Sequence, residues 1–193
     1  MFKTFSRISK KYSTPEKVQR LLLSYKYNQQ KPETMQSALK VWQTKAAHCL
    51  EATHFAAAVL EHQGYLPLAL SMESEDNIGH VVFLFQQKGF WGTVGKSKEI
   101  GLQGRRPVFK TIHRLVMSYF DEYVDDTGRM RAYQVLNLDH SQSQWRESLR
   151  NVWKSEKYIL NLKHKALPPL EKRYQRAYQV YYETGHQPKT GWW

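Results

Sequence analysis

Apolar residues recur with helical spacing in the first third of the chain. The stretch STPEKVQRLLLSYKYNQQ opens with a capping signature at Ser13 and then carries an apolar run, which predicts a helix from about Thr14 to Tyr27. The stretch KPETMQSALKVWQTK predicts a second helix over residues 31–45, because three of its apolar residues fall on one face. These residues are Met35, Leu39 and Trp42.

The next segment, AAHCLEATHFAAAVLEHQG, is apolar or small on nearly every side of a helix. A surface helix would show a polar face, so this pattern predicts a central helix enclosed by neighbouring elements. Gly64 follows the apolar run and is a natural helix stop.

The pattern then changes to that of strands. Three consecutive strands are expected at residues 65–72, 80–86 and 90–96, with a tight turn at Lys88–Gly89. Both faces of HVVFLF are apolar, so the middle strand should lie inside its sheet. A further strand is expected at residues 131–139.

The remaining segments are predicted to be mostly helical, with a loop at residues 101–107. Helices are expected at residues 108–123, 141–162 and 168–185. Because hairpin-linked strands stand beside runs of helices, the order of elements predicts an α+β fold with a small antiparallel sheet. The length suits one domain spanning residues 1–193.

The net charge of the chain indicates what kind of partner it could bind, and the number of cysteines indicates the redox state of its compartment. The chain has 29 Lys and Arg against 17 Asp and Glu, a formal charge of +12 that favours an acidic partner or nucleic acid. The positive residues are spread over both ends without a recognised reading motif. A single cysteine permits no internal disulfide and suits a reducing compartment, so we expect a cytoplasmic protein. No apolar run approaches the roughly 18 residues that span a bilayer.

The single cysteine, Cys49, opens the central helix and is followed at a distance by His80, which begins the middle strand. A helix N-terminus and a nearby imidazole both stabilise a thiolate, so this order predicts a nucleophile and its base. An oxyanion formed in acyl chemistry would be bound by the Cys49 amide, with Gln43 as a second donor six residues upstream.

The hairpin register suggests a third member of the site. If the turn is a two-residue loop, Gln87 pairs with Phe90 and His80 faces Ser97 across the ladder. A serine at that place accepts a hydrogen bond but carries no charge to stabilise an imidazolium. A register slip of one residue would put Lys96 there instead.

Residues 35–123 resemble the transglutaminase-like superfamily, a circularly rearranged relative of the papain fold. The resemblance is carried by AHCLEATHFAAAVLEHQGY and GHVVFLFQQKGFWGTVGKS in this order, and it is greatest to uncharacterised bacterial members. It implies a papain-like core with helical additions at both ends, Cys49 as nucleophile, His80 as base and Trp91 along a substrate groove. The acidic residue usual in the second strand of the family has no Asp or Asn counterpart between Thr93 and Ser97.

The activity implied is cysteine-dependent hydrolysis or transfer at an amide or isopeptide bond of a peptide or protein, with no cofactor. The alternative is a non-catalytic papain-like binding module that binds an acidic partner or nucleic acid through its basic surface. A third interpretation is that Cys49 is an inert core thiol, which is the common role of a lone buried cysteine.

A metal site is disfavoured by spacing. His48, Cys49 and His54 are close in sequence, but adjacent positions on a helix point in different directions and no second cysteine completes a zinc set. Glu51 is either a functional acid or, as we expect, a solvated or dipole-favoured carboxylate in an early helical turn. The acidic segment at residues 73–76 is expected to lie in an exposed loop that precedes His80.

Overall fold

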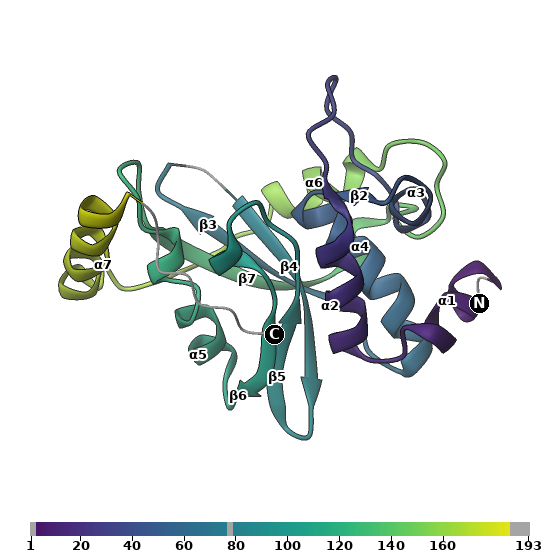
Figure 1. Ribbon diagram of the computed structural model, residues 1–193, viewed down its shortest axis with the longest axis horizontal. Coiled ribbons are helices and arrows are strands. Elements are labelled where there is room, and N and C mark those ends of the chain that lie inside the picture. The colour runs from purple at the N-terminus through teal and green to yellow at the C-terminus, as the bar shows by residue number, and fades with distance from the viewer. Residues whose placement is uncertain (1–2, 77–78, 186–193) are drawn as a thin grey trace.

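The computed structural model describes residues 3–76 and 79–185, and it has a mixed α+β architecture built around one antiparallel sheet (Figure 1). Every pair of neighbouring strands in this sheet is antiparallel. The predicted α+β class and the antiparallel sheet are therefore confirmed. In sheet order the strands are β6 (Arg105–Phe109), β5 (Phe90–Val94), β4 (Gly79–Gln87), β3 (Leu68–Ser74), β7 (Met130–Asn137) and β8 (Lys165–Ala166).

Helices cover both faces of the sheet (Figure 1). In chain order they are α1 (Lys3–Lys11), α2 (Pro15–Ser24), α3 (Ala38–Thr44), α4 (Cys49–Leu60), α5 (Ile112–Met117), α6 (Trp153–Leu160) and α7 (Glu171–Thr184). Two short strands, β1 (Lys26–Tyr27) and β2 (Ala46–Ala47), pair in parallel just ahead of α4. Among the described residues, no helix has the length and apolar content needed to cross a bilayer.

The strand β4 divides the hydrophobic core into two parts. Val81, Phe83 and Phe85 belong to the core shared with α1 to α4, whereas Val82 and Leu84 belong to the core on the side of α5 and α7. This alternation follows from the two-residue period of a strand, and it explains why both faces of the segment are apolar. The prediction that this strand lies inside the sheet is confirmed, since β4 lies between β3 and β5.

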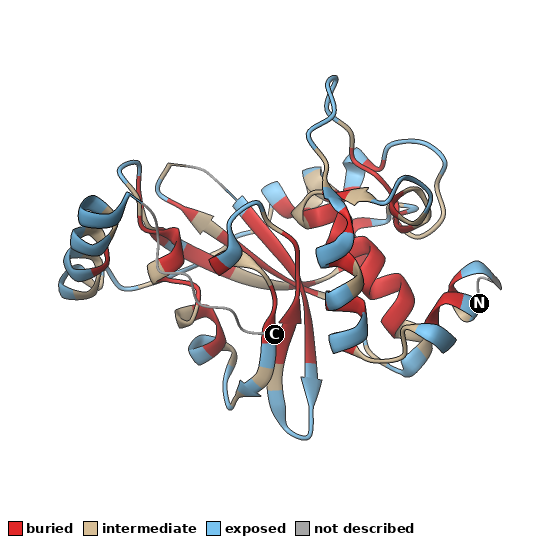
Figure 2. Ribbon diagram, viewed as in Figure 1, coloured by how far each residue is buried: buried red, intermediate tan, exposed pale blue. Residues whose placement is uncertain are grey.

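Helix α4 is enclosed, as its sequence predicted. Every residue from Leu50 to Leu60 is buried, and the helix contacts α1, α2, α3 and β4 (Figure 2). A short 3-10 turn, Glu61–Gln63, continues the helix to Gly64, whose φ of +85° ends it in the left-handed region. The rigid surroundings of α4 fix the position of Cys49 at its first turn.

The hairpin between β4 and β5 has the predicted turn. Lys88 and Gly89 both have positive φ, 50° and 80°, as the two central residues of a type I′ turn require. Gln87 pairs with Phe90, and the pairing runs to Phe83 and Val94 before it ends.

The expected opposition of His80 and Ser97 is wrong, although the turn is correct. Strand β5 ends at Val94, so Ser97 lies outside the ladder. His80 pairs instead with Met72 of β3, its other neighbour.

The extent of several helices differs from the prediction. Helix α3 begins only at Ala38, where the Ser37 hydroxyl accepts a hydrogen bond from the Lys40 amide and acts as its N-cap. The residues before it carry a cis Lys31–Pro32 bond and form an irregular segment. In α2 the N-cap is Thr14 rather than Ser13.

The second half of the chain shows the same overestimate of helix. Strand β6 occupies residues 105–109, where the sequence predicts the end of a loop and the start of a helix. The helix predicted at residues 108–123 is reduced to α5 and the 3-10 turn Asp121–Tyr123. The helix predicted at residues 141–162 is reduced to α6. The apolar residues in these segments have helical spacing, but the backbone forms only short helices and turns separated by irregular stretches.

Candidate active site

Cys49 is the first residue of α4 and is a free, half-buried thiol. The backbone amides of a first helical turn have no partner within the helix and point toward the N-terminus, which favours an anion there. A cavity of about 480 Å³ opens at the sulfur, and its walls come from α4, β3, β4, β7 and α6. Cys49 therefore combines an anion-stabilising position with access from outside.

His80 lies at the start of β4 and is held by a backbone carbonyl. Its Nε2 atom is 2.7 Å from the oxygen of Leu102, the last residue of the 3-10 turn Ile100–Leu102. Since a carbonyl only accepts hydrogen bonds, Nε2 carries the proton and donates it. The Nδ1 atom is then left as the nitrogen that can act on a neighbouring thiol.

The electrostatics of Cys49 favour the thiolate. Burial alone would raise the pKa of the thiol, but hydrogen bonds and charge interactions with His48 and His80 outweigh it and hold the pKa well below its ordinary value. Two imidazoles therefore flank one sulfur, from the chain just before α4 and from the start of β4.

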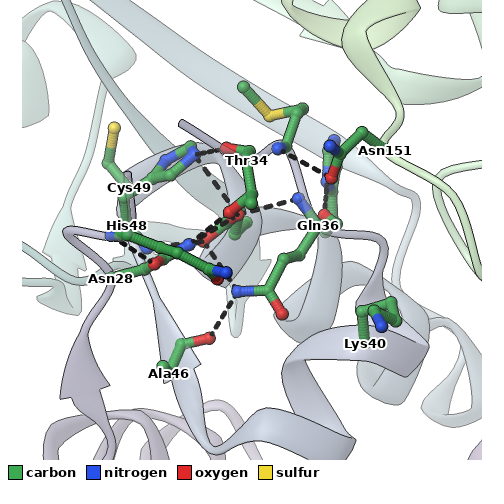
Figure 3. A network of polar contacts seen from close by, with 12 residues as sticks. Asn28, Thr34, Gln36, Lys40, Ala46, His48, Cys49 and Asn151 are labelled. Atoms are coloured by element: carbon green, nitrogen blue, oxygen red, sulfur yellow. Dashed lines mark hydrogen bonds and ion pairs between the residues drawn. The ribbon is translucent and has the colours of Figure 1, made fainter. Parts of the chain in front are cut away.

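A polar network next to Cys49 includes Asn28, Thr34 and Gln36 (Figure 3). The hydrogen bonds of this network converge on Glu51. Its carboxylate is fully buried and accepts hydrogen bonds from the His48 and Gln36 amides at 2.9 and 2.7 Å. The Asn28 side-chain amide donates to both of its oxygens at 3.0 and 2.9 Å, and the Thr34 hydroxyl adds a bond at 3.3 Å. The expectation of a solvated Glu51 is wrong, because the segment before α3 wraps over it.

His48 is held by the same network and leans against Cys49. Its Nε2 atom is 3.3 Å from the Thr34 carbonyl oxygen and 3.5 Å from a Glu51 carboxylate oxygen. Burial alone would lower the pKa of His48, but the interactions with Cys49, Glu51 and the Thr34 carbonyl raise it to about 9. The imidazole is therefore protonated at neutral pH.

The other residues expected in the site lie apart from the sulfur. The Ser97 hydroxyl accepts a hydrogen bond from the Glu99 amide at 3.2 Å, so it stabilises its own loop while Leu102 holds His80. Gln43 is exposed on α3 and does not line the cavity at Cys49. Trp91 is partly buried on β5 against the core of α5 and α7, and it does not line that cavity either.

The acidic segment before His80 is only partly exposed. Glu73 lines the cavity and contacts His164 Nδ1 at 3.1 Å and Arg131 at 3.6 Å. Glu75 is the exposed member and pairs with Arg129 at 3.1 Å. Glu73 is thus part of the wall of the cavity that Cys49 also lines.

Across the described residues there is no group of three or more His, Cys, Asp or Glu side chains arranged to hold a metal. His54, the third residue weighed for such a site, lies in the core and bonds the Gln36 carbonyl through Nδ1 at 3.1 Å. Its ring stacks on Trp145.

No family model matches this chain. Comparison with curated proteins also finds no match.

Proposed function

We propose that the protein is a cysteine-dependent acyl-transfer enzyme with a transglutaminase-like, papain-like core. The observation that carries this proposal is the Cys49 sulfur at the N-terminus of α4, flanked by His48 and His80 and open to a cavity. An inert core thiol has neither imidazole partners nor access. The order of nucleophile helix, strand with base and antiparallel sheet supports the papain-like assignment.

The reaction proceeds through a thioester. The Cys49 thiolate attacks the carbonyl carbon of an amide or isopeptide bond, a carbon–sulfur bond forms, and the first-turn amides of α4 stabilise the oxyanion. The carbon–nitrogen bond then breaks as an imidazolium beside the sulfur gives its proton to the leaving amine. Water or a second amine attacks the thioester, loses its proton to the imidazole and releases the thiolate.

His80 is the base of this proposed site. Its Nδ1 takes the thiol proton, while the Nε2–H bond to Leu102 fixes the ring and its tautomer. A neutral carbonyl orients the ring but adds less stabilisation to an imidazolium than a carboxylate would. The buried carboxylate of Glu51 acts instead on the other imidazole beside the sulfur, that of His48.

Thiol alkylation tests the proposal. At pH 6 an ordinary thiol is almost wholly protonated, whereas a thiol with a lowered pKa remains reactive. We expect iodoacetamide to modify Cys49 at pH 6 at least about 10-fold faster than it modifies glutathione, since one pKa unit changes the thiolate fraction tenfold. The Cys49→Ala variant is the control for other sites, and a rate equal to that of glutathione would contradict the proposal.

The second proposal is a binding module, and a surface on α7 favours it. Lys172, Arg173 and Arg176 line a hollow of about 510 Å³ together with Asp121. With the formal charge of +12, this surface suits an acidic protein or nucleic acid. We place the enzyme in the cytoplasm, where its only thiol remains reduced.

A further inference from the structure

The two histidines beside Cys49 differ in their access to substrate. The His48 side chain is 20% exposed and lines the cavity at Cys49, whereas His80 is 4% exposed and does not line it. A group that exchanges a proton with substrate must lie within hydrogen-bond reach of it. Of the two imidazoles, His48 is the one that meets this requirement.

His48 also lines a second cavity, of about 410 Å³. Its charged lining carries both signs, with Glu33 and Glu156 beside Lys31 and Lys98, and Tyr27 and Trp153 add aromatic faces. Glu156 lines both cavities. Aromatic faces and a carboxylate are the groups that bind an amine. The two cavities therefore meet at His48 and Glu156, next to the reacting sulfur.

We propose that His48 is the catalytic acid and base toward the substrate, that the cavity at Cys49 takes the acyl group, and that the second cavity takes the leaving or attacking amine. The inference rests on the proposed function and divides its proton transfers between two residues. His80 takes the proton of the thiol, and His48 serves the amine.

The hydrogen bonds of His48 support this division. Its Nε2 is held by the Thr34 carbonyl and Glu51, so its Nδ1 is the nitrogen left for Cys49 and substrate. In Figure 3 the His48 ring lies beside the Cys49 side chain at the edge of the network. During acylation the Nδ1 proton passes to the leaving amine, and during deacylation Nδ1 takes a proton from water or the new amine.

The charge next to His48 changes during the proposed reaction, and the change favours first the release and then the uptake of a proton by His48. The groups acting on it are Cys49, Glu51, Glu156 on α6 and His54 on α4. While the thiolate is present, it helps to hold His48 protonated as an acid. Acylation removes that negative charge, so His48 loses its proton more easily and becomes a base for the second half of the reaction.

An activated ester separates the two roles. In p-nitrophenyl acetate the leaving group departs without a proton, so acylation of Cys49 does not need His48, whereas attack of water on the thioester does. We compare wild type with His48→Asn, which keeps a preferred N-cap side chain, and with His113→Asn, an exposed histidine on α5, as the matched control. Burst rates are divided by the iodoacetamide rate of each variant at the same pH, which corrects for changes in thiolate fraction.

We expect His48→Asn to keep the corrected burst and to lose about 100-fold in steady-state turnover, the usual contribution of a general base. His113→Asn should match wild type in both phases. If wild type shows a burst and His48→Asn turns over within threefold of it, the role of His48 is overturned and the proposed function stands. Release of p-nitrophenol by wild type no faster than by Cys49→Ala overturns both.

Discussion

At the scale of single residues, the site is defined by one sulfur between two imidazoles. The positions of Cys49 at a helix start and of His80 at a strand start were predictable from the sequence pattern, and the structure brings the two side chains together. The position of His48 was not predictable, since neighbouring positions in a helix diverge. In the structure His48 is the N-cap with an extended backbone, φ −89° and ψ −175°, so helical rotation does not apply to it. Its side chain lies against Cys49 while Thr34 and Glu51 hold its Nε2 atom.

Replacing the sulfur should change the titration of His48. The Cys49 thiolate is among the groups that raise the pKa of His48 to about 9, so Cys49→Ser removes a stabilising negative charge. We expect the pKa of His48 to fall toward the ordinary value near 6.5, followed by NMR of the imidazole protons. A pKa that stays at about 9 in Cys49→Ser would show that Glu51 and Thr34 alone set it.

At the scale of elements, helix α4 was predictable and the segment before it was not. The all-round apolar pattern identified α4 as enclosed. Residues 31–45 were assigned to one helix on the spacing of apolar positions, but residues 28–36 instead supply donors to Glu51. A buried carboxylate needs such donors, and nothing in a periodicity count shows where they come from. For the same reason, the sequence pattern did not show that the Leu102 carbonyl orients His80.

Helix α4 carries a fully buried histidine, His54, whose protonation should depend on folding. Burial is the main cause that lowers the pKa of His54 to about 4, and its Nε2 has no partner among the described residues. As pH falls from 6.5 to 4, the unfolded chain binds a proton here that the folded chain does not. The free energy of unfolding should then drop by about 3 kcal/mol.

Urea unfolding at pH 7 and pH 4 measures this effect. His54→Asn keeps a donor toward the Gln36 carbonyl but does not titrate, and the carboxylates common to both proteins cancel in the comparison. We expect wild type to lose about 3 kcal/mol more than the variant on acidification. Equal losses in the two proteins would show that His54 does not resist protonation.

At the scale of the whole molecule, the α+β class and the sheet of hairpins were predictable from the change of period along the chain. The edge strand β6 and helix α1 were not, because each is too short for its apolar spacing to stand out in the sequence. The +12 charge is also a property of the whole chain, and it makes electrostatic binding of polyanions an expectation independent of the thiol.

Duplex DNA tests the basic surface. We expect weak binding whose log affinity falls linearly with log salt, measured by fluorescence anisotropy. The double variant Lys172→Gln, Arg176→Gln removes two exposed charges of α7 and should make the slope shallower by about 1 to 2, while Cys49→Ala should leave it unchanged. Affinity that does not change with salt would exclude this surface as a polyanion site.

The most direct test of the central claim is the capture of an acyl-enzyme. Wild type mixed with p-nitrophenyl acetate and quenched in acid within the burst should carry one acetyl group on Cys49, located by peptide mass spectrometry and released by neutral hydroxylamine as a thioester is. Cys49→Ala should remain unmodified under the same conditions. Acetylation confined to lysines, or none on Cys49, would contradict the assignment of Cys49 as the nucleophile.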